Sequence, residues 1–217
     1  MNKKDLCEYK DRSKSRNEER IPVICDLILQ LWINYKKHDC QNMGFYRVLS
    51  AVDSKGRENG VDTFYYEEDM WYDIISKMID ESKELKVNFG LKEYEIMDMQ
   101  HTISKFDLFW RLHNDLRFAQ IIPVFSNLVQ KEICNLSCDY WNDFFDKVNS
   151  EKIKQDIQMT DDVIDRIQNT DIIKEIHSGF SDEKVENDRQ KTLISLGLRR
   201  HKMEVLLGEI EKGNGDK

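Results

Sequence analysis

The sequence has few of the residues that interrupt helices, with two prolines and nine glycines among 217 residues. No apolar run approaches the ~20 residues that a membrane-spanning helix needs. The first residues lead into no apolar secretory segment. No glycine-rich phosphate loop and no nucleophile elbow is present. We therefore expect a cytoplasmic protein that has no membrane span and needs no cofactor.

Cysteine is scarce in a way that excludes a disulfide framework. The five cysteines are an odd number without framework spacing, which is typical of a reducing compartment. Charged residues make up 34% of the chain and apolar residues 40%, a globular composition. There are 22 lysines but only 11 arginines and two alanines, a bias that indicates an AT-rich genome, such as that of a low-GC bacterium or its phage.

Positive charge is also in short supply, and the net charge is −8. Residues 21–150 carry 21 acidic and 14 basic side chains, so most of the surplus lies in the central part of the chain. Such a surface repels phosphate backbones and attracts basic molecules. Nucleic acid is therefore an improbable general partner, and a basic protein is the expected one.

Apolar residues recur mostly at helical spacing and not in strict alternation. Ile24, Ile28 and Leu31 form one such stripe, and Pro22 is well placed for the first turn of its helix. We predict an all-α fold.

An internal repeat is the most specific pattern in the chain. A D-x-W-x-D motif followed by apolar residues and a lysine occurs twice. The predicted alignment places Asp69–Met78 on Asp139–Val148, Asp26–Trp32 on Asp107–His113, and Asp39–Val52 on Asp115–Leu128.

The predicted organisation is two degenerate three-helix repeats packed together, followed by a C-terminal helical extension. The regions are a charged N-terminal segment (1–20), repeat 1 (21–85), repeat 2 (103–150) and a C-terminal helical region (151–217).

Within the repeats, we predict first helices over 22–37 and 103–113 and second helices that open at Asp39 and Asp115. Pro123 should lie inside the second of these. Third helices should end near Glu84 and Asn149, and Ser54–Asp62 should form a loop. Beyond the repeats, Thr160 and Thr170 should cap short helices, the second ending at Ser178-Gly179, before a long helix over about 183–212.

Two segments carry a resemblance to known proteins. Trp110 followed by Asp115–Ile122 resembles a Trp-bearing helix followed by D-x-R-F-G-Q-L-I, with Ala119 in place of the glycine. Asp62–Asp69 resembles the D-x-F-Y-x-E-D element of the same family, which consists of short uncharacterised helical proteins of bacteria and phages. The resemblance covers residues 21–150. It implies a small helical fold and no activity.

The repeated motif gives the candidate site. Carboxylates on a helix surface steer a basic partner, and exposed aromatic residues anchor it. We therefore predict a non-enzymatic interaction protein of the inhibitor, immunity or anti-defence type. The predicted binding residues are Asp69, Trp71, Asp73, Asp139, Trp141 and Asp143.

Two alternatives remain open at this point. Asp69, Asp73, Asp139 and Asp143 on two facing helices would hold a divalent metal, as in a metal-dependent hydrolase. The basic run Arg199–Lys202 would suit a nucleic-acid accessory protein, although acidic residues flank it.

Overall fold

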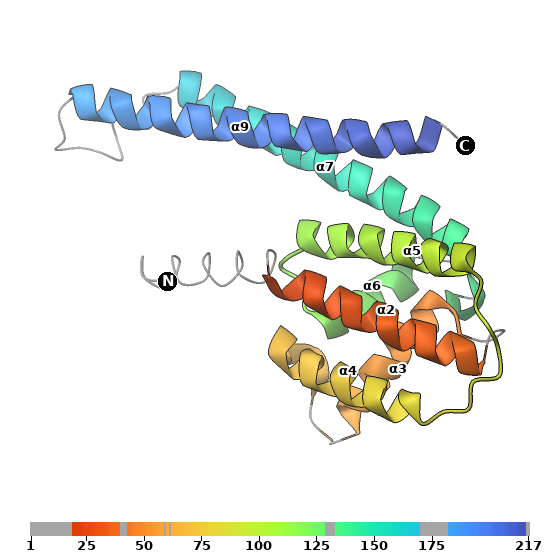
Figure 1. The fold of residues 1–217 in the computed structure, drawn as a ribbon. Coiled ribbons are helices and arrows are strands. Elements are labelled where there is room, and N and C mark those ends of the chain that lie inside the picture. The colour runs from red at the N-terminus through yellow and green to blue at the C-terminus, as the bar shows by residue number, and fades with distance from the viewer. Residues whose placement is uncertain are drawn as a thin grey trace. The chain divides into compact units, whose positions relative to one another are not determined.

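The protein is described here from a computed structural model, which covers residues 19–39, 43–58, 60, 62–128, 133–169 and 182–215 (Figure 1). Over these ranges the regular elements are helices and no strand occurs, which confirms the all-α prediction. The elements are α2 (Ile21–His38), α3 (Phe45–Arg57), η2 (Thr63–Tyr65), α4 (Glu68–Lys83), α5 (Glu93–Leu112), α6 (Phe118–Leu128), η3 (Ile133–Asn135), α7 (Cys138–Asn169) and α9 (Asp182–Gly215).

The chain divides into two compact units, Met1–Phe145 (unit 1) and Asp146–Lys217 (unit 2). The boundary falls within α7, which is one continuous helix. Both predicted repeats lie almost entirely in unit 1. No helix in the described ranges is both long enough and apolar enough to cross a bilayer.

In unit 1, α2 lies between α4 and α5 and runs antiparallel to α5 (Figure 1). Its first turn contains Pro22, whose missing N–H costs nothing there. Its last turn contains Lys36, Lys37 and His38, whose positive charge is favourable at the negative end of the helix dipole. The buried side of α2 is apolar throughout, so this helix forms the centre of unit 1.

The two sets of elements in unit 1 follow the same order: two helices, a 3-10 turn and a third helix. Their buried positions also recur at constant spacings. In α2 and α5 the spacing is 78 residues, as in Ile21/Met99, Ile28/Phe106 and Trp32/Trp110. In α3 and α6 it is 73, as in Phe45/Phe118, Val48/Ile121 and Val52/Phe125. In the third helices it is 70, as in Trp71/Trp141 and Ile75/Phe145.

The two sets also pack on each other reciprocally. Phe45 of α3 lies 5.2 Å from Trp141 of α7 between ring centroids, and its counterpart Phe118 of α6 lies 4.8 Å from Trp71 of α4. Reciprocal contacts of this kind are expected when two similar sets of helices pack around a twofold axis. They support the predicted repeat, whose origin by duplication stays a prediction.

Hydrogen bonds at the starts of α3 and α6 follow the same relation. The indole N–H of Trp32 donates to the carbonyl of Met43 (2.8 Å), two residues before α3 begins. The indole N–H of Trp110 donates to the carbonyl of Leu116 (2.9 Å), two residues before α6 begins. Each first helix therefore fixes the entry of the second helix in the same way.

The predicted alignment is wrong by three residues in the first two helices. Asp26 was aligned with Asp107, but the buried positions place it opposite Ser104. The predicted pairing of Asp39 with Asp115 is shifted by the same three residues. A shift of three residues turns an α-helix by nearly a full turn, so apolar positions still fall on apolar positions. The sequence pattern alone cannot distinguish the two registers.

The second helices do not open at the predicted aspartates. Asp39 follows α2, where its N–H donates to the carbonyl of Tyr35 (2.8 Å), and α3 begins only after Gly44. Asp115 lies in a turn before α6. The start of α6 is capped instead by Gln120, whose side-chain oxygen accepts from the N–H of Arg117 (2.9 Å). Pro123 lies inside α6, as predicted.

The predicted loop Ser54–Asp62 begins too early, because α3 continues to Arg57. Gly56 in its last turn is buried against the ring of Trp71, where an added Cβ would approach Trp71 Cζ3 to 2.9 Å. Gly56 therefore serves close packing inside the helix and does not mark a turn.

The first helix of the second set begins ten residues before its predicted start, at Glu93. The third helices differ in length. The first of them, α4, ends at Lys83, close to the predicted Glu84. The second, α7, passes the predicted end at Asn149 and continues to Asn169. Thr160 lies within α7, and its hydroxyl donates to the carbonyl of Asp156 (2.7 Å) instead of capping a new helix.

In unit 2, α9 runs antiparallel to the second half of α7 (Figure 1). Arg200 pairs with Asp161 (2.6 Å) and Lys154 pairs with Glu211 (2.9 Å) along this hairpin. The long helix predicted over 183–212 is confirmed as α9. The predicted N-terminal segment up to residue 18 and the helix from Thr170, with its end at Ser178-Gly179, lie outside the described residues.

Candidate functional site

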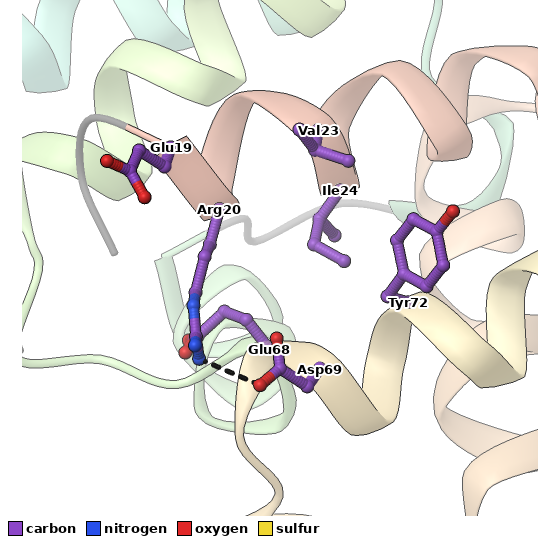
Figure 2. A pocket seen from close by; sticks show the side chains of 7 residues that line it. All are labelled: Glu19, Arg20, Val23, Ile24, Glu68, Asp69 and Tyr72. Atoms are coloured by element: carbon purple, nitrogen blue, oxygen red, sulfur yellow. Dashed lines mark ion pairs between the residues drawn. The ribbon is translucent and has the colours of Figure 1, made fainter. Parts of the chain in front are cut away.

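Asp69, the first residue of the predicted binding surface, lies in the first turn of α4. Its carboxylate pairs with the guanidinium of Arg20 at the start of α2 (3.1 Å), although its side chain is 72% exposed. Figure 2 shows Arg20 reaching across to Asp69 in a shallow pocket of about 110 Å³, with Glu68 and Tyr72 beside it. The negative charge of Asp69 is therefore partly compensated by the Arg20 guanidinium.

The two tryptophans of the motif are core residues, which corrects their prediction as partner anchors. Trp71 and Trp141 are both 0% exposed. Trp71 packs on Phe118, and Trp141 packs on Phe45 and Phe145. A side chain without exposed surface cannot contact a partner, so the predicted surface is reduced to its aspartates.

The other three aspartates of the motif, Asp73, Asp139 and Asp143, have exposed side chains. The two pairs do not converge, because α4 and α7 begin at opposite ends of the α2–α5 pair in unit 1 (Figure 1). Among the described residues, no three His, Cys, Asp or Glu side chains form a group able to hold a metal ion. The divalent-metal alternative therefore receives no geometric support.

The basic run of the nucleic-acid alternative lies on α9 in unit 2. Arg200 pairs with Asp161 and with Glu204 (2.8 Å), and these contacts raise the pKa of its guanidinium. Arg199 and Lys202 are exposed. One of the cationic side chains of this run is thus neutralised within the hairpin.

A larger groove of about 310 Å³ lies between α2 and α5. Pro22, Cys25, Asp26 and Leu29 line it from α2. The residues 78 positions later in the chain line it from α5, so each lining position has its counterpart in the other helix. The groove therefore lies between matching positions of α2 and α5.

One carboxylate in this groove has an unusual environment. Burial raises the pKa of Asp107 above its ordinary value, against the opposing effect of the neighbouring Arg111 guanidinium, and the Asp26 carboxylate raises it further. Arg111 pairs with Oδ2 of Asp107. The other oxygen, Oδ1, is buried and accepts no hydrogen bond.

The thiol of Cys25 lies in the same groove and is 2% exposed. Burial, then Asp107 and Asp26, raise its pKa well above the ordinary value. The thiol thus stays protonated at neutral pH. Because the thiolate is the nucleophilic form, Cys25 is a packing residue and not a reactive one.

Sequence reasoning did not identify Asp26 and Asp107 as site residues, although it used both to align the repeats. Asp107 lies among the buried apolar residues of α5, where a carboxylate is costly, whereas Asp26 is exposed on α2. An acidic residue at a position that the pattern assigns to the core is the signal that could have indicated the groove.

No protein-family model matches this chain, and no curated protein or solved structure is detectably similar to it.

Proposed function

We propose that this protein is a non-enzymatic interaction protein that presents an acidic surface to a basic protein partner. The proposal rests on the distribution of charge in unit 1. The exposed carboxylates of Asp73, Asp139 and Asp143 lie on its surface, and the surrounding chain, residues 21–150, carries seven more acidic than basic side chains.

The observation that carries the proposal is how the basic side chains of unit 1 are used. Arg117 pairs with Glu67 (2.9 Å), Arg57 with Asp53 (2.9 Å) and Lys83 with Asp80 (2.8 Å). Arg20, Lys55 and Arg111 likewise pair with carboxylates of the same unit. Such pairs add little stability, but they occupy basic groups and leave the surplus charge negative.

An acidic surface of this kind accelerates encounter with a basic partner more than it increases affinity. Its attraction is screened at high ionic strength, because the Debye length is only about 10 Å at 0.1 M salt. Binding should therefore fall when the carboxylates are neutralised and when salt is added.

The test compares three full-length forms in pull-downs from host lysate at low and high salt. The first is the wild type. The second carries Asn at Asp69, Asp73, Asp139 and Asp143. The third carries neutral amides at Asp162, Asp165, Glu204 and Glu209 of unit 2, which changes the net charge by the same amount. We expect a basic protein to be captured by the wild type and by the unit 2 variant, and lost by the unit 1 variant and in high salt.

Equal loss in both neutralised variants would indicate attraction by net charge alone and contradict a specific acidic surface on unit 1. A captured protein that is acidic, or whose binding is unaffected by salt, would contradict the proposal as a whole.

A further inference from the structure

We propose that the groove between α2 and α5 is the receptor for an arginine or lysine side chain of the basic partner, with Asp26 and Asp107 as the residues that recognise its charge. This inference rests on the proposed function and names the site at which the partner would be held.

The groove has a suitable size and lining for one long cationic side chain. Its volume of about 310 Å³ lies at the lower end of the ~300–1,000 Å³ found for ligand pockets. Pro22, Leu29 and Ile103 provide apolar surface. Arginine and lysine have apolar stems that pack on such surface while the charged end reaches a polar group.

The charges that line the groove all have one sign. Among the described residues, Asp26 and Asp107 are the only charged ones that line it, and no lysine, arginine or histidine does. Arg111 contacts Asp107 at Oδ2, which leaves Oδ1 without a hydrogen bond. A cation seated in the groove would offset the repulsion between the two carboxylates.

Comparison of the two helices separates a structural role from a binding role. The position of Asp107 on α5 corresponds to Leu29 on α2, 78 residues earlier. Leucine thus fits this position of the helix pair, whereas the aspartate is 14% exposed and buries a charge. Despite its pair with Arg111, burial and the neighbouring Asp26 carboxylate raise the pKa of Asp107, so its charge is held at a cost. A costly group where an apolar residue suffices is typical of a functional position.

Two other occupants fit the groove less well. A divalent cation needs several oxygen ligands, and no group of three acidic, histidine or cysteine side chains occurs among the described residues. An electrophile would need a thiolate, but the Cys25 thiol is buried and protonated.

The test is an NMR titration of the ¹⁵N-labelled full-length protein at low salt. The probes are the blocked peptides acetyl-Gly-Arg-Gly-amide and acetyl-Gly-Lys-Gly-amide. The matched control contains citrulline, which keeps the shape of arginine and lacks its charge. We expect the amides of Asp26, Ser104 and Asp107 to shift saturably with the cationic peptides, at a Kd on the order of 1 mM, and not with the citrulline peptide.

Two variants identify the recognising groups. Asp107→Asn should weaken binding of the arginine peptide at least about tenfold, the effect of 1.4 kcal/mol. Asp26→Asn changes an exposed residue that cannot disturb the core, and it should weaken binding in the same direction. Asp80→Asn, which changes an exposed carboxylate of α4 that pairs with Lys83, should leave the affinity unchanged. Thermal melting of each variant checks that the fold is intact.

Three results would overturn the inference: equal shifts with the citrulline peptide, shifts centred on Asp69 or Asp139 instead of the groove, or no shift at about 10 mM peptide, well above the expected Kd. The pull-down separates this failure from that of the proposed function. If Asp107→Asn retains a basic partner that the unit 1 variant loses, the groove is wrong and the acidic surface stands. If neither Asp107→Asn nor the unit 1 variant loses a basic protein that the wild type captures, the proposed function is wrong. The peptide titration still decides whether the groove binds a cation.

Discussion

Asp107 places a titratable group at a position of α5 where its counterpart in α2 is apolar. Burial raises the pKa of its carboxyl above the ordinary value of 3.8. The folded protein therefore binds the proton more tightly than the unfolded chain does. Ionisation of this group opposes folding, and the cost is complete only when the pH exceeds the raised pKa.

The first prediction concerns stability and pH. Below pH 3.8, Asp107 is protonated in both states, so the ionisation cost vanishes there. Asp107→Asn should be at least as stable as the wild type at neutral pH and should lose that advantage as the pH falls through the window between the raised pKa and 3.8. Urea unfolding, followed by tryptophan fluorescence at neutral pH and below pH 3.8, measures the difference in free energy of unfolding between the two proteins. A difference that does not vary with pH would show that ionisation of Asp107 carries no cost.

The four tryptophans differ in one atom's environment. The indole N–H groups of Trp32 and Trp110 donate to backbone carbonyls, whereas those of Trp71 and Trp141 are buried without an acceptor. A buried donor without a partner costs about 1–3 kcal/mol. Phenylalanine removes the donor together with part of the ring.

We therefore expect Trp71→Phe to be less destabilising than Trp110→Phe, by roughly 1 kcal/mol. Both residues are 0% exposed, so the loss of packing is similar. Chemical unfolding of the two variants, monitored by circular dichroism, provides the comparison. Equal free energies of unfolding would mean that the Trp110 hydrogen bond contributes no net stability.

At the scale of elements, glycine has opposite effects in two helices. Gly56 lies in the last turn of α3 against Trp71, with Trp71 Cη2 only 2.9 Å from the position of an added Cβ. Gly197 lies within α9, where an added Cβ would meet nothing within 4 Å. The first glycine is required by packing, and the second only weakens its helix.

Gly56→Ala should therefore destabilise unit 1 by roughly 1–3 kcal/mol, the usual cost of overpacking. Gly197→Ala should stabilise α9 by roughly 0.5–1 kcal/mol through helix propensity. Thermal melting by circular dichroism gives both signs. A neutral Gly56→Ala would show that the Trp71 ring moves aside at little cost.

Helix identity followed from the sequence more closely than helix boundaries did. The helices predicted over 22–37 and 183–212 match α2 and α9 nearly to their ends. The starts of α3 and α6 were misplaced, because Asp39 and Asp115 are good N-caps in isolation. Tertiary hydrogen bonds from Trp32 and Trp110 fix where those helices begin instead.

At the scale of the whole molecule, all four tryptophans lie in unit 1. Tryptophan fluorescence therefore reports unit 1, whereas helical circular dichroism reports both units. Unit 2 depends on the seam between α7 and α9, where Leu196 is half-buried.

Leu196→Asp should consequently lower the helical signal and the melting temperature recorded at 222 nm, because it places a charge in that seam. The midpoint of the tryptophan fluorescence transition should stay the same. Simultaneous shifts of both transitions would show that the two units unfold as one cooperative system.

The sequence by itself determined the helical class, the acidic balance and the recurrence of the D-x-W-x-D motif. These properties depend on local periodicity and composition, which one chain displays directly. It did not determine that Trp71 and Trp141 are core residues, because a tryptophan beside aspartates suits either a core or a surface. Nor did it determine the register of the two sets, since a slip of three residues preserves each apolar face. Only the tertiary structure decided these points, and only the antiparallel pairing of α2 with α5 brought Asp26 and Asp107 into one groove.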